Sequence, residues 1–188
     1  RKTLTVALIP LFLFAASEGF ADPIKDSLDK GAKFLSVNQN PDGGYGPFGT
    51  ESRVKNESDV GITAFIVYTL AIHPRKYQVV DGPFVSRAVD YLLKHQQPDG
   101  GFYHPKDPVL KNYRTSVALM ALVKLNRVAY SEQIRRARAF IVSQQRNESA
   151  NYSKAEHASF GAVGQSGSRR GDLSNTAFAA EAMREAGF

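Results

Sequence analysis

Cysteine is absent from all 188 residues of the chain. This absence excludes disulfide bonds, thiolate nucleophiles and zinc sites built on cysteine, so packing alone must hold the fold. Phosphate-binding loops, Gly-x-Ser-x-Gly nucleophile motifs and His-Glu-x-x-His metal motifs are missing as well. The histidines are not spaced as metal ligands, and His104 with Asp107 is too weak a pattern to hold an ion. We therefore predict no metal and no cofactor.

No basic cluster stands out, although the net charge is +6 and the isoelectric point is about 9.5. The densest basic group, Arg135, Arg136 and Arg138, has apolar neighbours at helical spacing, which is typical of a solvated helix face. We therefore predict no nucleic-acid partner. A chain of this length with 43% hydrophobic and 22% charged residues is typical of one globular domain.

The N-terminus carries a short apolar run over residues 4–16, preceded by two basic residues and followed by small ones. This order is typical of a secretory signal peptide, and the run is shorter than the roughly 20 residues of a membrane span. We predict a signal peptide over residues 1–21, a mature domain over 22–188 and no membrane span after cleavage. The location would be secreted or periplasmic. Cleavage after Ser17, or a buried N-terminal helix, are the alternatives.

One sequence pattern occurs three times, at spacings of 57 and 49 residues. A basic residue, a small residue, an aromatic and an aliphatic residue lead to a glutamine, a glycine-containing turn and a second aromatic residue. The first copy has Lys30, Gly31, Phe34, Leu35, Gln39, Gly43 and Tyr45. The second copy has Arg87, Ala88, Tyr91, Leu92, Gln96, Gly100 and Phe102. The third has Arg136, Ala137, Phe140, Ile141 and Gln145, and then Asn147-Glu148-Ser149 in place of Pro-Asp-Gly-Gly.

Each copy predicts a helix, a turn and a second helix. The first helices carry charges on one face, whereas the second helices, expected at residues 59–71, 115–125 and 172–186, are largely apolar. A helix that is apolar on every side must be buried or line an apolar cavity. We expect greater burial for Ile62, Phe65, Ile66 and Leu70 than for Lys33, Arg87 and Asp90.

These patterns predict an all-α fold of three helical hairpins, with repeats over about residues 27–80, 83–130 and 131–188. The first helices would lie outside and the second helices inside. An α/α barrel and an open solenoid both satisfy the pattern, which does not distinguish them.

The first helix and its turn resemble the QW motif of squalene and oxidosqualene cyclases, on the residues given above. Tyr45 and Phe102 stand where that motif has tryptophan, and the chain contains no tryptophan. The segment 171–177, Gly-Asp-Leu-Ser-Asn-Thr-Ala, is similar to prenyltransferase and squalene-oxidase repeat proteins. The resemblance implies a terpenoid cyclase-like α/α toroid. Complete toroids of this kind have six hairpins, which implies that this chain, whose ends both look cut, is half of a barrel.

The catalytic groups of these families are missing from the sequence. It contains no Asp-x-Asp-Asp acid of the class II cyclases, no Asp, Cys and His zinc set of the protein prenyltransferases, and no Cys-Gln pair of the thioester domains that share the toroid. Whether the protein is an enzyme, and on which substrate, stays open at this point, because a catalytic acid could lie beyond Phe188.

The best polar candidates for a ligand site are Asp59 and Asp172, each at the expected start of a second helix. They would face one rim of the barrel, although a helix N-cap explains the same positions. Tyr45, Tyr68 and Tyr113 would line a cavity and stabilise a cation, or belong to the core.

The repeat glutamines Gln39, Gln96 and Gln145 are expected to be structural. A glutamine at a helix end can bond backbone groups of the turn or of the next helix. The aromatic residue after the turn glycines, as in Tyr45 and Phe102, would pack over that bond and join adjacent hairpins.

Three functions fit these features. The favoured one is an exported, terpenoid cyclase-like repeat protein that binds an apolar, isoprenoid-like small molecule between its inner helices. The alternatives are a non-catalytic scaffold with a protein partner, and a cyclase or transferase whose catalytic repeats lie outside the chain. We also expect the last inner helix to expose Phe178, Ala179, Ala182 and Met183, and the chain not to be a stable monomer.

We predict that the exported protein begins at Asp22, because the basic, apolar and small-residue order ends at Ala21. N-terminal sequencing of exported protein checks this. Exported protein that keeps Arg1 would contradict it.

Overall fold

The computed structural model describes residues 23–151, 159–165 and 171–187. The signal peptide predicted over residues 1–21 therefore lies outside the described residues. The described part contains these α-helices: α1 (Pro23–Val37), α2 (Val60–Ile72), α3 (Pro83–Lys94), α4 (Lys111–Asn126), α5 (Ser131–Ser143) and α6 (Leu173–Glu185). Short 3-10 helices lie at Gly49–Glu51, Val79–Asp81 and Glu148–Ala150, and no β-strand occurs in these ranges.

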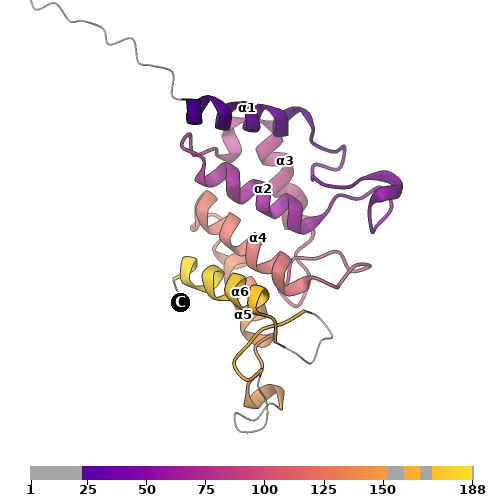
Figure 1. Ribbon diagram of the computed structural model, residues 1–188, viewed down its shortest axis with the longest axis vertical. Helices are drawn as coiled ribbons and strands as arrows, with labels where there is room; N and C mark the ends of the chain where they lie inside the picture. The colour runs from indigo at the N-terminus through magenta and orange to yellow at the C-terminus, as the bar shows by residue number, and fades with distance from the viewer. Residues whose placement is uncertain (1–22, 152–158, 166–170, 188) are drawn as a thin grey trace, which may run out of the picture.

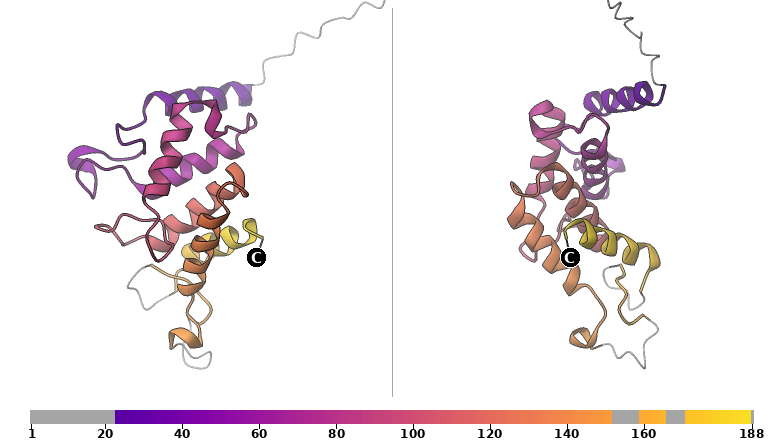
Figure 2. Two further views of the ribbon diagram at one scale, coloured as in Figure 1. Left: turned by 180° about the vertical axis from the view of Figure 1, so that it is seen from behind. Right: turned by 90° about the vertical axis from the view of Figure 1, so that its left-hand side faces the viewer.

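The helices form a stack of hairpins. Helices α2, α4 and α6 lie side by side, α3 packs against α2, and α5 packs against α4 (Figure 1). Figure 2 shows α3 and α5 as a layer behind the row of α2, α4 and α6. Helix α1 lies at one end of the stack, where it contacts α3 and buries only Ala32. The structure confirms the all-α helical-hairpin fold.

Helix α4 is the centre of the core because α2, α5 and α6 all pack against it. Its residues from Arg114 to Val123 are all buried. The helix begins at Lys111, four residues before the expected start at Thr115. The apolar pattern did not predict its first turn because this turn is polar. Asn112 and Arg114 in this turn are nonetheless buried.

A glutamine side chain joins each of the first two turns to the helix that follows it. Gln39 donates from Nε2 to the carbonyl oxygen of Gly43 at 2.7 Å and to that of Phe84, in α3, at 2.9 Å. Gln96 donates in the same way to Gly100 at 3.2 Å and to Gln133, in α5, at 2.9 Å. One carboxamide thus closes its own turn and holds the next hairpin.

The basic residue of each later repeat holds the same turns from the other side. Arg87 donates from Nη2 to the carbonyl oxygens of Asn40 and Pro41, at 3.0 and 2.8 Å. Arg136 donates to the carbonyl oxygen of Gln97 at 2.6 Å. The prediction of a purely solvated face is therefore wrong for Arg136, because the turn ahead of its helix presents carbonyl oxygens that need donors.

The turn glycines are required by close packing. A Cβ atom on Gly43 would lie 2.7 Å from the carbonyl oxygen of Arg87, and one on Gly100 would lie 2.4 Å from that of Arg136. Both glycines also have positive φ, +90° and +92°. Any larger side chain would push the next helix away.

The third turn lies later in the chain than the sequence pattern placed it. Gln145 donates from Nε2 to the carbonyl oxygen of Gly161 at 3.0 Å, and Gly161 has φ +79°. Thr176 Oγ1 accepts the N–H of Val163 at 3.1 Å, as Thr63 Oγ1 accepts that of Tyr45 in the first repeat. The assignment of this turn to residues 147–149 is therefore wrong, because an insertion separates the glutamine from its glycine.

Two burial expectations need correction. Leu70 is buried as expected, but Ile62 and Phe65 are 41% and 48% exposed, since they lie on a side of α2 that other described elements leave open. Ala179 and Ala182 are buried rather than exposed, because they face α4, whereas Phe178 and Met183 are half-buried.

We predict that Gln96→Ala lowers the free energy of unfolding by about 1–3 kcal/mol, because the Gly100 carbonyl loses its side-chain donor and α5 loses its bond to the turn. Gln144→Ala is the matched control, since among the described residues the Gln144 carboxamide bonds only the exposed Ser143 hydroxyl. Thermal melts of both variants check this. Equal melting temperatures for the two would contradict a bridging role.

Candidate functional site

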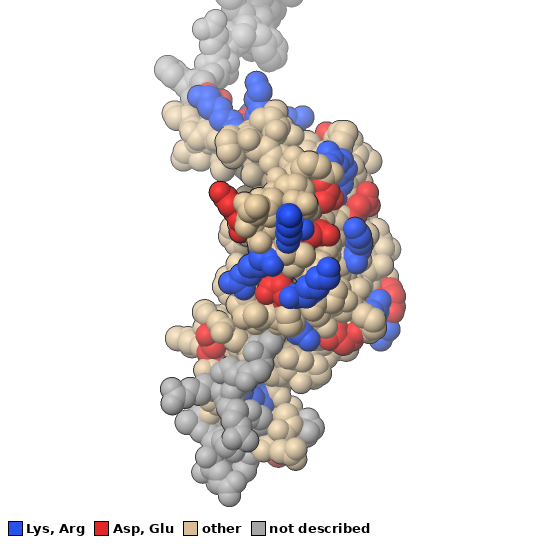
Figure 3. Space-filling view, turned by 90° about the vertical axis from the view of Figure 1, so that its right-hand side faces the viewer, with Lys and Arg blue, Asp and Glu red and all other residues tan. Residues whose placement is uncertain are grey.

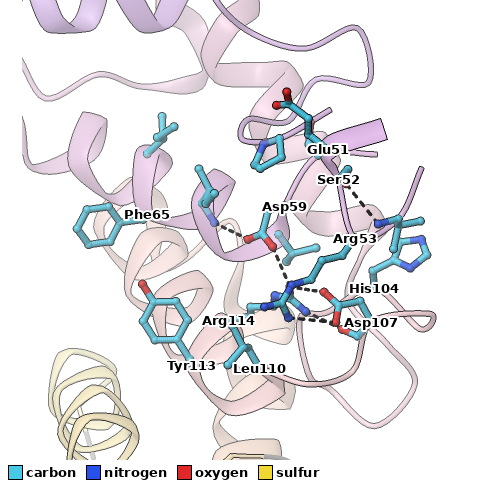
Figure 4. A pocket seen from close by; sticks show the side chains of 16 residues that line it. Glu51, Ser52, Arg53, Asp59, Phe65, His104, Asp107, Leu110, Tyr113 and Arg114 are labelled. Atoms are coloured by element: carbon cyan, nitrogen blue, oxygen red, sulfur yellow. Dashed lines mark hydrogen bonds and ion pairs between the residues drawn. The ribbon is translucent and has the colours of Figure 1, made fainter. Parts of the chain in front are cut away.

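A pocket of about 440 Å³ opens between the N-terminal ends of α2 and α4. Residues 47–54, which include the 3-10 helix Gly49–Glu51, and residues 104–110 complete its walls (Figure 4). The pocket forms there because the two loops that lead into α2 and α4 project beyond the ends of the helices (Figure 1).

One wall of the pocket is apolar. Ile62, Phe65 and Ile66 line it from α2, and Tyr113 lines it from α4. The Tyr113 ring packs edge-on against Phe178 of α6 with ring centroids 4.8 Å apart, and burial raises the pKa of its hydroxyl. Exposure of these apolar side chains to water is unfavourable, and an apolar ligand that covered them would remove this cost in free energy.

The opposite end of the pocket is built around Arg114, which is only 2% exposed. Its Nη2 lies 2.8 Å from Asp59 Oδ2 and 2.6 Å from Asp107 Oδ2, and its Nη1 donates to the Asp107 carbonyl oxygen at 2.6 Å. Arg53 adds a second cation, with Nη1 3.5 Å from Asp107 Oδ1. Four charges from three segments of the chain therefore meet at this end (Figure 4).

The network keeps Asp107 and Arg114 charged. Burial alone would raise the pKa of the Asp107 carboxyl, but the hydrogen bond and charge of Arg114, with the charge of Arg53, lower it. Burial alone would lower the pKa of Arg114, but its bonds to Asp107 and Asp59 raise it. Asp107 is thus an anion near neutral pH and has no proton to give to a substrate.

Charges of both signs occur beyond the pocket as well. Basic and acidic side chains are interspersed over the face shown in Figure 3, without a patch of one sign.

Asp59 belongs to the pocket, but its oxygens already have partners. Its Oδ1 accepts the N–H of Ile62 at 2.9 Å, as an N-cap does, while Oδ2 binds Arg114. Asp172 caps α6 by accepting the N–H of Asn175 at 2.8 Å, and it does not line this pocket. The hydrogen bond from Ser174 and that N–H lower the pKa of the Asp172 carboxyl.

The three tyrosine candidates are not brought together. Tyr113 lines the pocket, whereas Tyr45 is buried beneath the first turn and Tyr68 packs half-buried against the core. Burial raises the pKa of Tyr45 to about 12. The structure thus gathers Asp59 and Tyr113 at one site and places Asp172, Tyr45 and Tyr68 elsewhere.

Sequence reasoning missed Arg114, Arg53 and the role of Asp107. A signal for Arg114 was present, since it is a cation among the small and apolar residues that become the buried α4. Arg53 and Asp107 lie in loops and gave no pattern. Among the described residues, no three His, Asp or Glu side chains are grouped so that they could hold a metal ion. Within the same ranges no helix is long and apolar enough to cross a bilayer.

The family model of the A-macroglobulin TED domain matches residues 17–185, which is most of the chain. The chain belongs to this family. The TED domain has the terpenoid cyclase-like α/α toroid fold, so the resemblance drawn from the repeat motif holds at the level of the fold.

A curated relative points to the same superfamily. Drimenyl diphosphate synthase from Streptomyces showdoensis is 31% identical over 106 residues, which are 56% of this chain and 17% of the synthase. The chain thus spans about a sixth of the length of that relative.

Thioester chemistry is excluded for these 188 residues. A thioester needs a cysteine sulfur, and the sequence contains none. The pocket must therefore be understood from its apolar wall and its ion network.

We predict that Arg114→Ala lowers the free energy of unfolding by about 3–5 kcal/mol, because it leaves Asp59 and Asp107 without their shared cation. Urea denaturation checks this. In the matched control Arg135→Ala, the lost ion pair with Glu132 is exposed on α5, and we expect little change. A similar small effect in both variants would contradict the prediction.

Proposed function

We propose that this TED-family domain is an exported binding module that holds an apolar, isoprenoid-like ligand in the Arg114 pocket. The observation that carries the proposal is the apolar wall of the pocket. Ile62 and Phe65 expose apolar area there, and their helix, α2, contains no charged residue. Each Å² of such area that a ligand covers contributes about 25 cal/mol to binding.

The size and polarity of the pocket support a small amphipathic ligand. Its volume of about 440 Å³ lies within the range of roughly 300–1,000 Å³ that is common for small-molecule sites. The ligand would lay its hydrocarbon part along α2 and Tyr113 and turn its polar end toward Arg53 and Arg114. The similarity to a synthase named for drimenyl diphosphate, a terpenoid, agrees with this ligand class.

Binding is better supported than catalysis by the residues at hand. Protonation of an alkene needs a carboxylic acid that carries a proton, and the chain has no Asp-x-Asp-Asp motif. The pocket carboxylates Asp59 and Asp107 are occupied as acceptors for Arg114. A cyclase or transferase would need an acid from outside these residues.

Export is part of the proposal, and its support is the N-terminal sequence. Two basic residues, an apolar run over residues 4–16 and small residues up to Ala21 follow the order of a secretory signal peptide.

We predict that Phe65→Ser weakens the binding of farnesol about tenfold, because roughly 1.4 kcal/mol of apolar contact is lost. Isothermal titration calorimetry measures the affinity. Phe34→Ser is the matched control, since Phe34 is an exposed phenylalanine of α1 that does not line the pocket, and this variant should bind farnesol as the parent does.

Two outcomes would count against the proposal in different ways. Equal binding by both variants would show that farnesol binds elsewhere. Absence of binding by the parent protein would reject the isoprenoid-like ligand itself.

A further inference from the structure

The charged side chains at one end of the Arg114 pocket limit the ligand that it can take. The pocket lining contains three carboxylates and two guanidinium groups, from Glu51, Asp59, Asp107, Arg53 and Arg114. Acidic groups thus outnumber basic ones. A ligand with an anionic head group would meet carboxylates of the same sign, and such a contact is unfavourable where water is partly excluded.

The two arginines offer little to an anion. Arg114 is only 2% exposed, and its Nη2 already binds both Asp59 and Asp107. A ligand anion would have to displace one of these carboxylates, which would then lack its cation. Arg53 is exposed, but its guanidinium faces Asp107, with Nη1 3.5 Å from Oδ1. An anionic head group therefore gains little from either side chain.

A neutral oxygen, in contrast, finds a hydrogen-bond donor at the same end of the pocket. His104 lines the pocket there, and its Nδ1 accepts the backbone N–H of Lys106 at 3.1 Å. Because Nδ1 is an acceptor, the ring hydrogen lies on Nε2. Among the described residues this Nε2 has no hydrogen-bond partner, and it is not buried. The pocket thus presents an unused N–H beside its ion network.

The ring of His104 is held from two directions. It packs against the ring of the buried His95 with centroids 5.6 Å apart, and His95 Nδ1 donates to the Tyr91 carbonyl oxygen at 2.7 Å. On the other side, the N–H of Asp107 donates to the His104 carbonyl oxygen at 2.9 Å. Since Arg114 binds the Asp107 carboxylate, the ion network also fixes the loop that presents His104.

The hydroxyl groups of the pocket are in use or lie elsewhere. The hydroxyls of Ser52 and Ser58 already donate to a carbonyl oxygen and to a carboxylate, at 2.5 and 2.7 Å. Tyr113 belongs to the apolar wall, and Figure 4 shows it on the far side of the pocket from His104. Among the described side chains, His104 is therefore the uncharged donor that remains at the charged end.

We infer that the pocket selects a ligand with a neutral oxygen head group, an alcohol or a carbonyl, and that the Nε2–H of His104 donates to this oxygen. The hydrocarbon part of the ligand lies along α2 and Tyr113, as in the proposed function, on which this inference rests. A few polar groups of this kind commonly fix orientation and specificity in a pocket that is otherwise apolar. Anionic esters, such as diphosphates, are disfavoured by the carboxylates.

Isothermal titration calorimetry with three head groups on one hydrocarbon chain tests the selection. Farnesol, farnesal and farnesyl diphosphate are titrated at about pH 8, where an ordinary histidine is neutral. Farnesol and farnesal should bind within about threefold of each other, because each carries an acceptor oxygen, and the diphosphate at least about tenfold more weakly.

The outcomes separate this inference from the proposed function. Binding of the diphosphate as tight as that of farnesol overturns the neutral head group and leaves an apolar ligand in the pocket standing. Binding of farnesol without farnesal overturns the donor role of the protein. Absence of binding by all three ligands overturns the proposed function and the inference together.

His104→Phe tests the donor, because it keeps a ring against His95 but has no N–H. Its affinity for farnesol should fall about fivefold, the effect of one hydrogen bond between neutral groups. Its affinity for farnesene, the same chain without oxygen, should be unchanged when measured by displacement of farnesol, and this shows that the pocket is intact. Equal loss of both ligands, or loss of neither, overturns the role of His104.

Lys106→Ala is the matched control. The Lys106 side chain is exposed on the same loop and does not line the pocket, and the variant keeps the N–H that His104 accepts. Both farnesol and farnesene should bind to it as they do to the parent. A loss of farnesol binding equal to that of His104→Phe would assign the effect to the loop and overturn the role of the ring.

Discussion

The carboxamide of Gln96 holds the arrangement on which the rest of the structure depends. It closes the second turn at Gly100 and donates to Gln133 of α5, so one side chain fixes the spacing of two hairpins. An amide can do this because it carries two hydrogens on one nitrogen, one for the Gly100 carbonyl of the turn and one for the Gln133 carbonyl in the first turn of α5. Gln39 makes the same pair of bonds in the first turn, and α2, α4 and α6 lie side by side in one row.

The pocket follows from that row. With the inner helices fixed, the loops ahead of α2 and α4 meet, and Arg114 can reach both Asp59 and Asp107. A buried cation with two carboxylates costs desolvation, which its bonds offset only while every partner is present. The network therefore orders the loop ends of the pocket, while the apolar side chains of α2 remain available to a ligand.

The chain belongs to the TED family, but its 188 residues contain no cysteine that could form a thioester. What remains is a toroid-type scaffold with an apolar wall beside Phe65. This wall is flanked by the loops ahead of α2 and α4, and it suits a small apolar molecule.

The sequence by itself determined the helical hairpins, because apolar spacing, the Asp59 and Asp172 caps and the turn glycines are local signals. Only the tertiary structure decided which side chains meet across hairpins. Arg114 and Asp107 form a site because two loops converge on them, and Gly161 closes the third turn because its carbonyl oxygen accepts the Gln145 amide. Such contacts depend on the path of the chain in space, and no periodicity in the sequence encodes that path.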